Sequence, residues 1–164
     1  MKDRKIRSGH IIAAVIFIAY MCGLSYFLFF SPMMGRHHDS LSYLNNVSNY
    51  RDYNLKPFRL IRIYIEYADT LGFKYIFLNL YGNVLCFMPF GFLIAFILNG
   101  KHKFINTIFI AAIVSTIIEL LQYIFAVGTG DIDDVILNTC GAVLGYAVYV
   151  IINKIFRRGR KKVN

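Results

Sequence analysis

Four long apolar segments dominate the chain and determine which solvent it can fold in. They cover residues 10–30, 76–98, 104–127 and 135–153. A helix of about 20 apolar residues crosses the hydrocarbon core of a bilayer, which is about 30 Å thick, and each segment is close to that length or longer. Only 16% of the 164 residues are charged, against about 25% in soluble domains. The sequence therefore predicts an all-α integral membrane protein with four transmembrane helices.

The basic residues are concentrated at the two ends of the chain and in one loop. Four lie within residues 1–9, two are Lys101 and Lys103, and six lie within residues 154–164, twelve of the 18 Lys and Arg residues in all. Because cytoplasmic segments next to membrane helices keep the excess of positive charge, both termini are predicted to be cytoplasmic and the loop at 128–134 external. Basic residues that directly adjoin membrane helices also attract anionic lipids. Membrane lipids are therefore expected partners, and nucleic acid is not, despite the formal charge of +9.

The longest stretch outside the membrane, residues 31–75, has two different parts. Its first part is rich in Asn and Ser and has no helical period, so we predict an irregular external loop. Over about residues 58–69, charged residues recur at helical spacing and apolar residues occupy the rest of the surface. This pattern predicts an amphipathic helix that lies on the membrane surface. Its charged residues are Arg59, Arg62, Glu66 and Asp69.

Polar side chains of the apolar segments are concentrated at one depth. Glu119 is the only acid well inside a segment, where an ionisable group costs about 2.5 to 3.5 kcal/mol on insertion scales. In the predicted topology, the polar residues of the second, third and fourth helices lie toward the external surface, and the inner halves are almost wholly apolar. We therefore predict a polar pocket that opens toward the outer leaflet. Its candidate residues are Asn79, Asn83, Glu119, Gln122, Asp131, Asp134 and Asn138, with Arg59 and Arg62 from the surface helix.

A purely structural role is the alternative for much of this set. Asp residues in the first turn of a helix cap free N–H groups and interact favourably with the helix dipole. Buried Asn and Gln residues commonly tie membrane helices together. Glu119 fits a structural role less well, because Asn or Gln supplies the same hydrogen bonds without an ionisable group. Both interpretations of the Asn and Asp residues remain open at the level of sequence.

Four sequence blocks, in their order and spacing, resemble the VanZ-like family. They read YNLKPF at 53–58, NLYGNVLCFMPFGFL at 79–93, SxxIExxQ at 115–122 and DIDDVILNTCGAVLGY at 131–146. The resemblance extends over about residues 53–149 and includes every pocket candidate from Asn79 to Asn138. A family motif is a hypothesis about function that structural context has to support.

The resemblance implies a multi-pass protein of the bacterial cytoplasmic membrane. The founding activity of the family is lowered susceptibility to the glycopeptide antibiotic teicoplanin, without an altered peptidoglycan precursor. The resemblance implies no enzymatic reaction and no cofactor. Many members carry an Arg shortly before the acidic run, whereas here residues 127–130 read VGTG. The sequence contains no phosphate-binding loop, no HExxH motif and no Ser-His-Asp order, so we assign no catalytic residue and no metal ligand.

Two functions from different classes fit the predicted pocket. The first is a non-enzymatic membrane factor that engages a lipid-linked cell-wall precursor or the acyl tail of a lipoglycopeptide at the outer leaflet. The alternative is a membrane-embedded enzyme acting on a lipid head group, with Glu119 as general acid or base. The carboxylates of residues 131–134 would then bind Mg²⁺ or Ca²⁺. A transporter fits less well, because the inner halves of the helices are apolar, and no oligomeric state is predicted.

Overall fold

The computed structural model describes residues 2–30, 53–125, 127–128 and 130–163. The predicted irregular external loop lies largely in residues 31–52, outside these ranges. Six helices are described, and the predicted all-α class is confirmed. Four are long: α1 (Lys2–Phe30), α6 (Phe73–Ile97), α7 (Lys103–Ile124) and α8 (Ile132–Val163). Two short helices, α4 (Arg59–Glu66) and α5 (Ala68–Leu71), precede α6.

Each long helix contains a segment that is long and apolar enough to cross a membrane. The first three segments have 22 residues each, which at 1.5 Å per residue gives roughly 33 Å, enough for the hydrocarbon core. Large apolar side chains such as Ile11, Phe109 and Ile151 are exposed on the outside of the helices, as expected where lipid is the solvent. The chain is therefore a multi-pass membrane protein. The four segments are Gly9–Phe30, Ile76–Ile97, Lys103–Ile124 and Ile132–Phe156.

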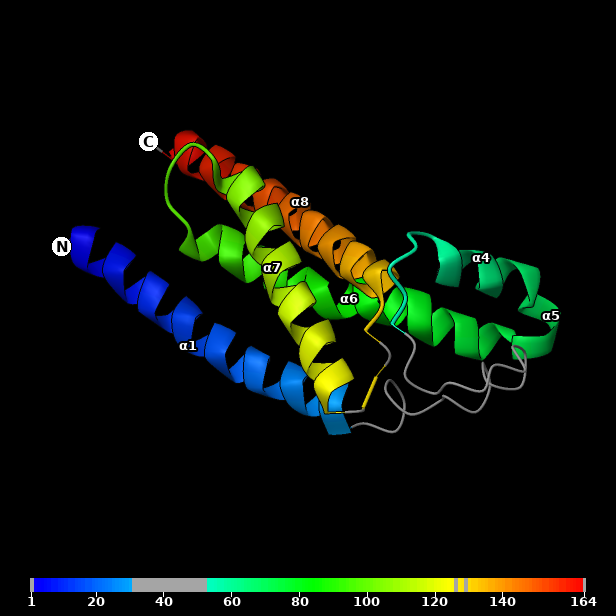
Figure 1. Cartoon of the computed structure of the whole chain (residues 1–164). Coiled ribbons are helices and arrows are strands. Elements are labelled where there is room, and N and C mark those ends of the chain that lie inside the picture. The colour runs from blue at the N-terminus through cyan, green and yellow to red at the C-terminus, as the bar shows by residue number, and fades with distance from the viewer. Residues whose placement is uncertain (1, 31–52, 126, 129, 164) are drawn as a thin grey trace.

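Successive long helices run in opposite directions, so both chain termini lie at the same end of the bundle (Figure 1). We call this the terminal end, and we call the opposite end, where α4 and α5 lie beside the start of α6, the distal end. α8 packs mainly on α6 and also on α7, whereas α1 packs chiefly on α6. The shared end of the termini agrees with the charge pattern, and its cytoplasmic position stays a prediction.

Glycine residues allow α6 and α8 to approach closely. A Cβ atom at Gly145 of α8 would lie 1.9 Å from the carbonyl oxygen of Met88 in α6. A Cβ atom at Gly91 of α6 would lie 2.0 Å from the carbonyl oxygen of Ala142 in α8. Small residues are typical of such interfaces, because membrane helices associate through close van der Waals packing. This contact sets the height and rotation of α8 relative to α6.

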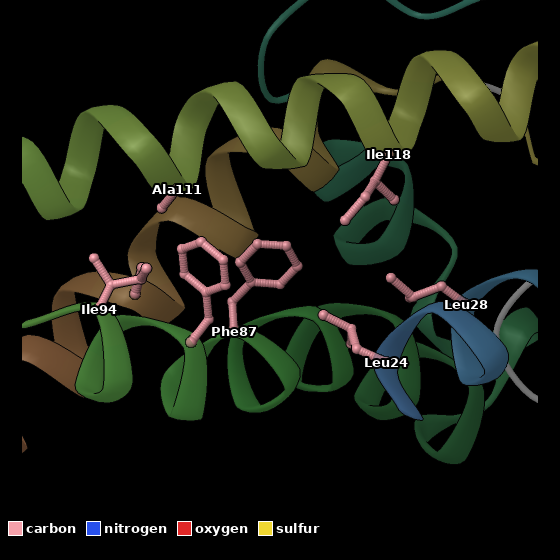
Figure 2. Packing of buried hydrophobic residues seen from close by; sticks show 8 residues of the cluster. Leu24, Leu28, Phe87, Ile94, Ala111 and Ile118 are labelled. Carbon is pink, nitrogen blue, oxygen red and sulfur yellow. The ribbon is translucent and has the colours of Figure 1, made fainter. Parts of the chain in front are cut away.

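An apolar cluster fills the space between α1, α6 and α7 (Figure 2). Leu24 and Leu28 of α1 face the fully buried Phe87 of α6, and Ile118 of α7 covers them from the other side. The Tyr20 hydroxyl of α1 also donates a hydrogen bond to the Cys86 carbonyl oxygen of α6. The cluster occupies the middle of the bundle, so polar side chains are left at its two ends.

Candidate functional site

The segment before α4 is fastened to the start of α8 at the distal end. Asn54 forms an isolated parallel β-bridge with Asp131. The Asn54 N–H donates to the Gly130 carbonyl oxygen at 3.2 Å, and the Ile132 N–H donates to the Asn54 carbonyl oxygen at 3.0 Å. The Asn54 side-chain amide donates to both carboxylate oxygens of Asp131, at 2.9 and 3.1 Å. Backbone and side chain therefore hold the same two segments together.

Asp131 also connects this contact to the acid of α7. Its N–H donates to Glu119 Oε2 at 3.0 Å, and its Oδ1 accepts the Asp133 N–H at 2.8 Å. Glu119 is 8% exposed and Asp131 is 5% exposed, so protein groups have replaced most of their water. Burial raises the pKa of Asp131 above its ordinary value. The hydrogen bonds from Asp133 and Asn54 and the positive charge of Arg59 oppose that rise.

Asp133 fastens α4 to the bundle. Its fully buried side chain accepts the backbone N–H of Phe58 at Oδ1 and that of Leu60 at Oδ2, the latter at 2.7 Å. Phe58 precedes α4 with a φ of 63°, a left-handed conformation that is uncommon for a residue with a side chain, and its own side chain forms no cap. Asp133 therefore supplies the acceptors that the first turn of α4 needs, from 75 positions along the chain.

Several amides of the predicted pocket form hydrogen bonds between helices. Asn83 of α6 donates to Asp134 Oδ1 of α8 at 2.6 Å. Asn138 of α8 donates to Ser115 Oγ of α7 at 2.8 Å. Such bonds tie membrane helices together. The structure therefore supports the structural interpretation for this part of the set.

The other candidate residues lie around the hydrogen-bonded carboxyl groups of Glu119 and the three Asp residues. Gln122 of α7 donates to the Leu28 carbonyl oxygen of α1 at 3.2 Å and is buried. Asn79 is half-buried in α6. Arg59 and Arg62 are exposed on α4. The structure thus brings Glu119 and the acidic run together with Asn54, and it leaves the two Arg side chains on the outer surface.

A pocket of about 300 Å³ opens between α7 and α8 beside the Glu119–Asp131 contact. Leu120 and Leu55 at its rim are 56% and 67% exposed, so the pocket opens to the outside of the bundle. The Tyr53 and Tyr123 rings meet edge to face at 6.2 Å on one side. The lining is largely apolar, with two buried carboxyl groups, which suits an apolar group of a ligand. The lining residues are Tyr53, Leu55, Thr116, Glu119, Leu120, Tyr123, Gly130, Asp131, Ile132 and Val135.

The helices that build this pocket match one protein family. A family model described as VanZ/LLP1 matches residues 17–153. The chain belongs to the VanZ/LLP1 family. Protein VanZ of Enterococcus faecium is 36% identical to the chain over 114 residues, a match that covers 66% of the chain and 60% of that relative. No solved structure matches the chain.

The family match confirms the resemblance that the sequence blocks indicate. The VanZ/LLP1 match begins at residue 17, so it also includes about the second half of α1, which lies outside the four motif blocks. α1 contributes to the apolar cluster and accepts the hydrogen bond from Gln122 through Leu28. The part of α1 from residue 17 onward is therefore included in the family match, and it packs against the rest of the bundle.

Two residues of the site were not among the pocket candidates selected from the sequence, where Asp133 appeared only as a possible metal ligand of the alternative function. Asn54 lies in the YNLKPF block, which was the only available signal for it, and Asp133 lies in the acidic run. Both take their importance from partners far away in the chain, Asp131 for the first and the start of α4 for the second. Residue spacing alone does not reveal such partners.

The three Asp side chains near the start of α8 interact with three different partners. Asp131 binds Asn54, Asp133 binds the first turn of α4, and Asp134 binds Asn83. In the described part of the chain, no group of three His, Cys, Asp or Glu side chains is arranged to hold a metal ion. These carboxyl groups of the VanZ/LLP1 protein accept hydrogen bonds from the protein, and Glu119 and Asp131 also form part of the pocket wall.

Proposed function

We propose that this VanZ/LLP1 protein is a non-enzymatic factor of the bacterial cytoplasmic membrane that lowers susceptibility to teicoplanin. It does so by holding the acyl tail of the lipoglycopeptide in the pocket between α7 and α8. The observation that carries the proposal is the composition of this pocket, which has apolar walls, an open side and the two buried carboxyl groups of Glu119 and Asp131. In the predicted topology the distal end faces the outside of the cell, where the antibiotic acts.

The pocket favours an apolar tail over the pyrophosphate of a lipid-linked cell-wall precursor. Glu119 and Asp131 are buried in its wall, and the carboxyl group of Asp134 lies close enough to interact electrostatically with both. A phosphate placed beside them would bring a negative charge into a largely apolar pocket that has no cation among its lining residues, and burying an unpaired charge is costly. Arg59 and Arg62 are exposed on α4 and are not among the lining residues. A precursor would therefore have to place its phosphates outside the pocket.

Affinity for an acyl tail has to come mainly from fit. The tail is already in an apolar solvent when it lies in the bilayer, so its transfer into the pocket releases little hydrophobic free energy. Close packing against Leu120, Tyr123 and Val135 supplies van der Waals contact, and the carboxyl groups of Glu119 and Asp131 can accept hydrogen bonds from the polar part of the ligand. Drug molecules held in this way are kept from their cell-wall target.

A pocket-filling substitution tests the proposal with a matched control. Leu120→Trp places an indole in the pocket, whereas Ile117→Trp adds the same ring to a position of α7 that is similarly exposed and does not line it. A Gram-positive host expressing wild type or either variant is tested against teicoplanin and against vancomycin, which lacks the acyl tail, with membrane levels measured. We expect Leu120→Trp to lose most of the teicoplanin protection and Ile117→Trp to keep it. No protection by wild type, or equal protection by both variants, would overturn the proposal.

The same host tests the role of the acid. Glu119→Gln retains an acceptor oxygen for the Asp131 N–H and removes the ionisable group, while Glu66→Gln makes the same change on exposed α4. We expect a selective loss of teicoplanin protection only for Glu119→Gln. The competing function, an enzyme acting on a lipid head group, predicts instead that purified wild type converts labelled lipid to a product that Glu119→Gln does not form.

A further inference from the structure

A second pocket, of about 330 Å³, lies at the terminal end of the bundle. Its walls come from α1, α6 and α8, from the loop between α6 and α7, and from the first residue of α7. It shares no lining residue with the distal pocket and is separated from it by the apolar cluster. The lining residues are His10, Phe92, Phe96, Asn99, Lys103, Tyr149, Ile152, Asn153 and Phe156.

Lys103 is the cation of this pocket and is half-buried. Its Nζ donates to the Ala95 carbonyl oxygen at 3.3 Å and to the Tyr149 hydroxyl at 3.2 Å. It also lies 5.2 Å from the centroid of the Tyr149 ring. All three contacts are with neutral groups, and Lys103 forms no ion pair with a residue that the structure describes. An ammonium group has three N–H donors, so one donor and the whole positive charge are left for a ligand.

Aromatic rings surround the cation. The Tyr149 ring meets Phe92 and Phe96 edge to face, with centroids 6.2 and 6.4 Å apart. Phe96 in turn packs on His10 of α1 at 5.7 Å. Tyr rings, like those of Trp, are enriched where membrane proteins cross the boundary between lipid and water. The Tyr149 ring, together with the ends of the apolar segments, places the pocket at the depth of lipid head groups.

The pocket has a polar side and an apolar side. Asn99 and Asn153 line the polar side, and neither side-chain amide is hydrogen-bonded within the described residues. Ile152 and Phe156 of α8 line the apolar side and are 38% and 68% exposed, so this side faces the surrounding lipid. Acidic residues are absent from the lining in the ranges that the structure describes. An anion in this pocket would therefore find the hydrogen-bond donors of Lys103, Asn99 and Asn153 and no carboxylate among the lining residues to repel it.

We propose that this pocket binds the phosphate head group of an anionic phospholipid from the leaflet at the terminal end. Lys103 is the direct phosphate ligand, Asn99 and Asn153 add neutral donors, and the acyl chains lie along Ile152 and Phe156. Charge-assisted hydrogen bonds to phosphate are strong, and basic pockets between membrane helices are suited to anionic head groups. The apolar side, open to the bilayer, favours a lipid over a soluble phosphate. The site is independent of any ligand at the distal end.

Native mass spectrometry of the full-length protein in a neutral detergent tests the site. Phosphatidylglycerol or phosphatidylcholine is titrated into wild type, Lys103→Met, Lys103→Arg and Lys101→Met. Lys101 is exposed in the loop just before α7, so its substitution makes the same charge change outside the pocket. We expect wild type, Lys103→Arg and Lys101→Met to prefer phosphatidylglycerol, and Lys103→Met to bind it roughly tenfold more weakly, the effect of losing one hydrogen bond to a charged group.

Two further arms keep the result interpretable. Inorganic phosphate at the lipid concentration should not displace phosphatidylglycerol, and displacement would mean that the pocket takes a soluble anion and not a lipid. Ile152→Trp keeps Lys103 but obstructs the apolar side, so it should also weaken phosphatidylglycerol binding even if Lys103→Met fails to fold. Equal binding of both lipids by wild type, or undiminished phosphatidylglycerol binding by folded Lys103→Met or by Ile152→Trp, would overturn the proposal.

Discussion

The side-chain amide of Asn54 donates to both carboxylate oxygens of Asp131, although 77 positions of the sequence separate the two residues. The same residues also pair through their backbones. This contact holds the segment before α4 against the start of α8 and places Tyr53 and Leu55 at the distal pocket. The segment that contains Tyr53 and Leu55 therefore completes the pocket between α7 and α8, although it lies far from both helices in the sequence.

Replacing Asn54 with Leu should destabilise the protein. The substitution removes the side-chain donor of the buried Asp131 carboxyl, and an unsatisfied buried polar group costs roughly 1 to 3 kcal/mol. Thermal unfolding in detergent, followed by circular dichroism, measures the effect. Asn106→Leu is the control, because Asn106 is exposed on α7, and surface substitutions are usually close to neutral. Equal midpoints for the two variants would contradict a stabilising role for the Asn54 contact.

Asp133→Ala should loosen the start of α4. Loss of a helix cap costs about 0.5 to 2 kcal/mol, which corresponds to roughly 2- to 30-fold faster amide exchange in that turn. Hydrogen exchange with site resolution at Phe58 and Leu60, whose N–H groups Asp133 accepts, is the measurement. Asp69→Ala, an exposed acid in α5, should leave both amides unchanged. Unchanged exchange in Asp133→Ala would show that α4 is held by other contacts.

Gly145→Ala should strongly disturb the contact between α6 and α8. Its Cβ would lie 1.9 Å from the Met88 carbonyl oxygen, so the helices have to separate, and overpacking typically costs about 1 to 3 kcal/mol. Gly23→Ala is the matched control within α1, because a Cβ there meets nothing within 4 Å. That variant should be neutral or stabilised by up to about 1 kcal/mol through helix propensity. Unfolding midpoints of both proteins in one detergent give the comparison, and a stable Gly145→Ala protein would argue against close approach.

The buried carboxyl of Asp131 should make stability depend on pH. Burial raises its pKa in the folded protein, so the folded state binds this proton more tightly than the unfolded state does. Its contribution is fully present below the unfolded pKa of about 3.9 and is lost as the pH rises through the folded pKa. The unfolding midpoint of wild type should therefore fall more steeply over this range than that of Asp131→Asn. Parallel pH profiles for the two proteins would contradict the prediction.

Reporter fusions test the predicted orientation. The excess of Lys and Arg at the termini predicts that the terminal end is cytoplasmic. A green fluorescent protein fused to the C-terminus should then fluoresce, and alkaline phosphatase at the same position should be inactive. Alkaline phosphatase inserted at Gly128, in the predicted external loop, should be active. The opposite pattern would place the distal pocket in the cytoplasm and remove the basis for contact with an external antibiotic.

Most of the architecture could be predicted from the sequence, because membrane insertion depends on local properties. The length and polarity of each apolar run determine whether it can cross a bilayer, with no knowledge of its neighbours. The helical period of residues 58–69 likewise predicted the helix that the structure divides into α4 and α5. Its place on the membrane surface stays a prediction. The depth of Glu119 followed from helix geometry and the predicted topology.

The partners of the polar residues could not be predicted, because they depend on how the helices pack. Successive residues of a helix point about 100° apart, so Asp133 and Asp134, adjacent in sequence, reach α4 and Asn83 respectively. Which group each carboxyl meets depends on the height and rotation of α8, and these are set where Gly145 lies against the Met88 backbone. The sequence by itself determined which residues are polar and toward which end of each helix they lie. Only the tertiary structure decided that most of them bind one another while Glu119 and Asp131 also border a pocket, because those contacts join segments that no local pattern relates.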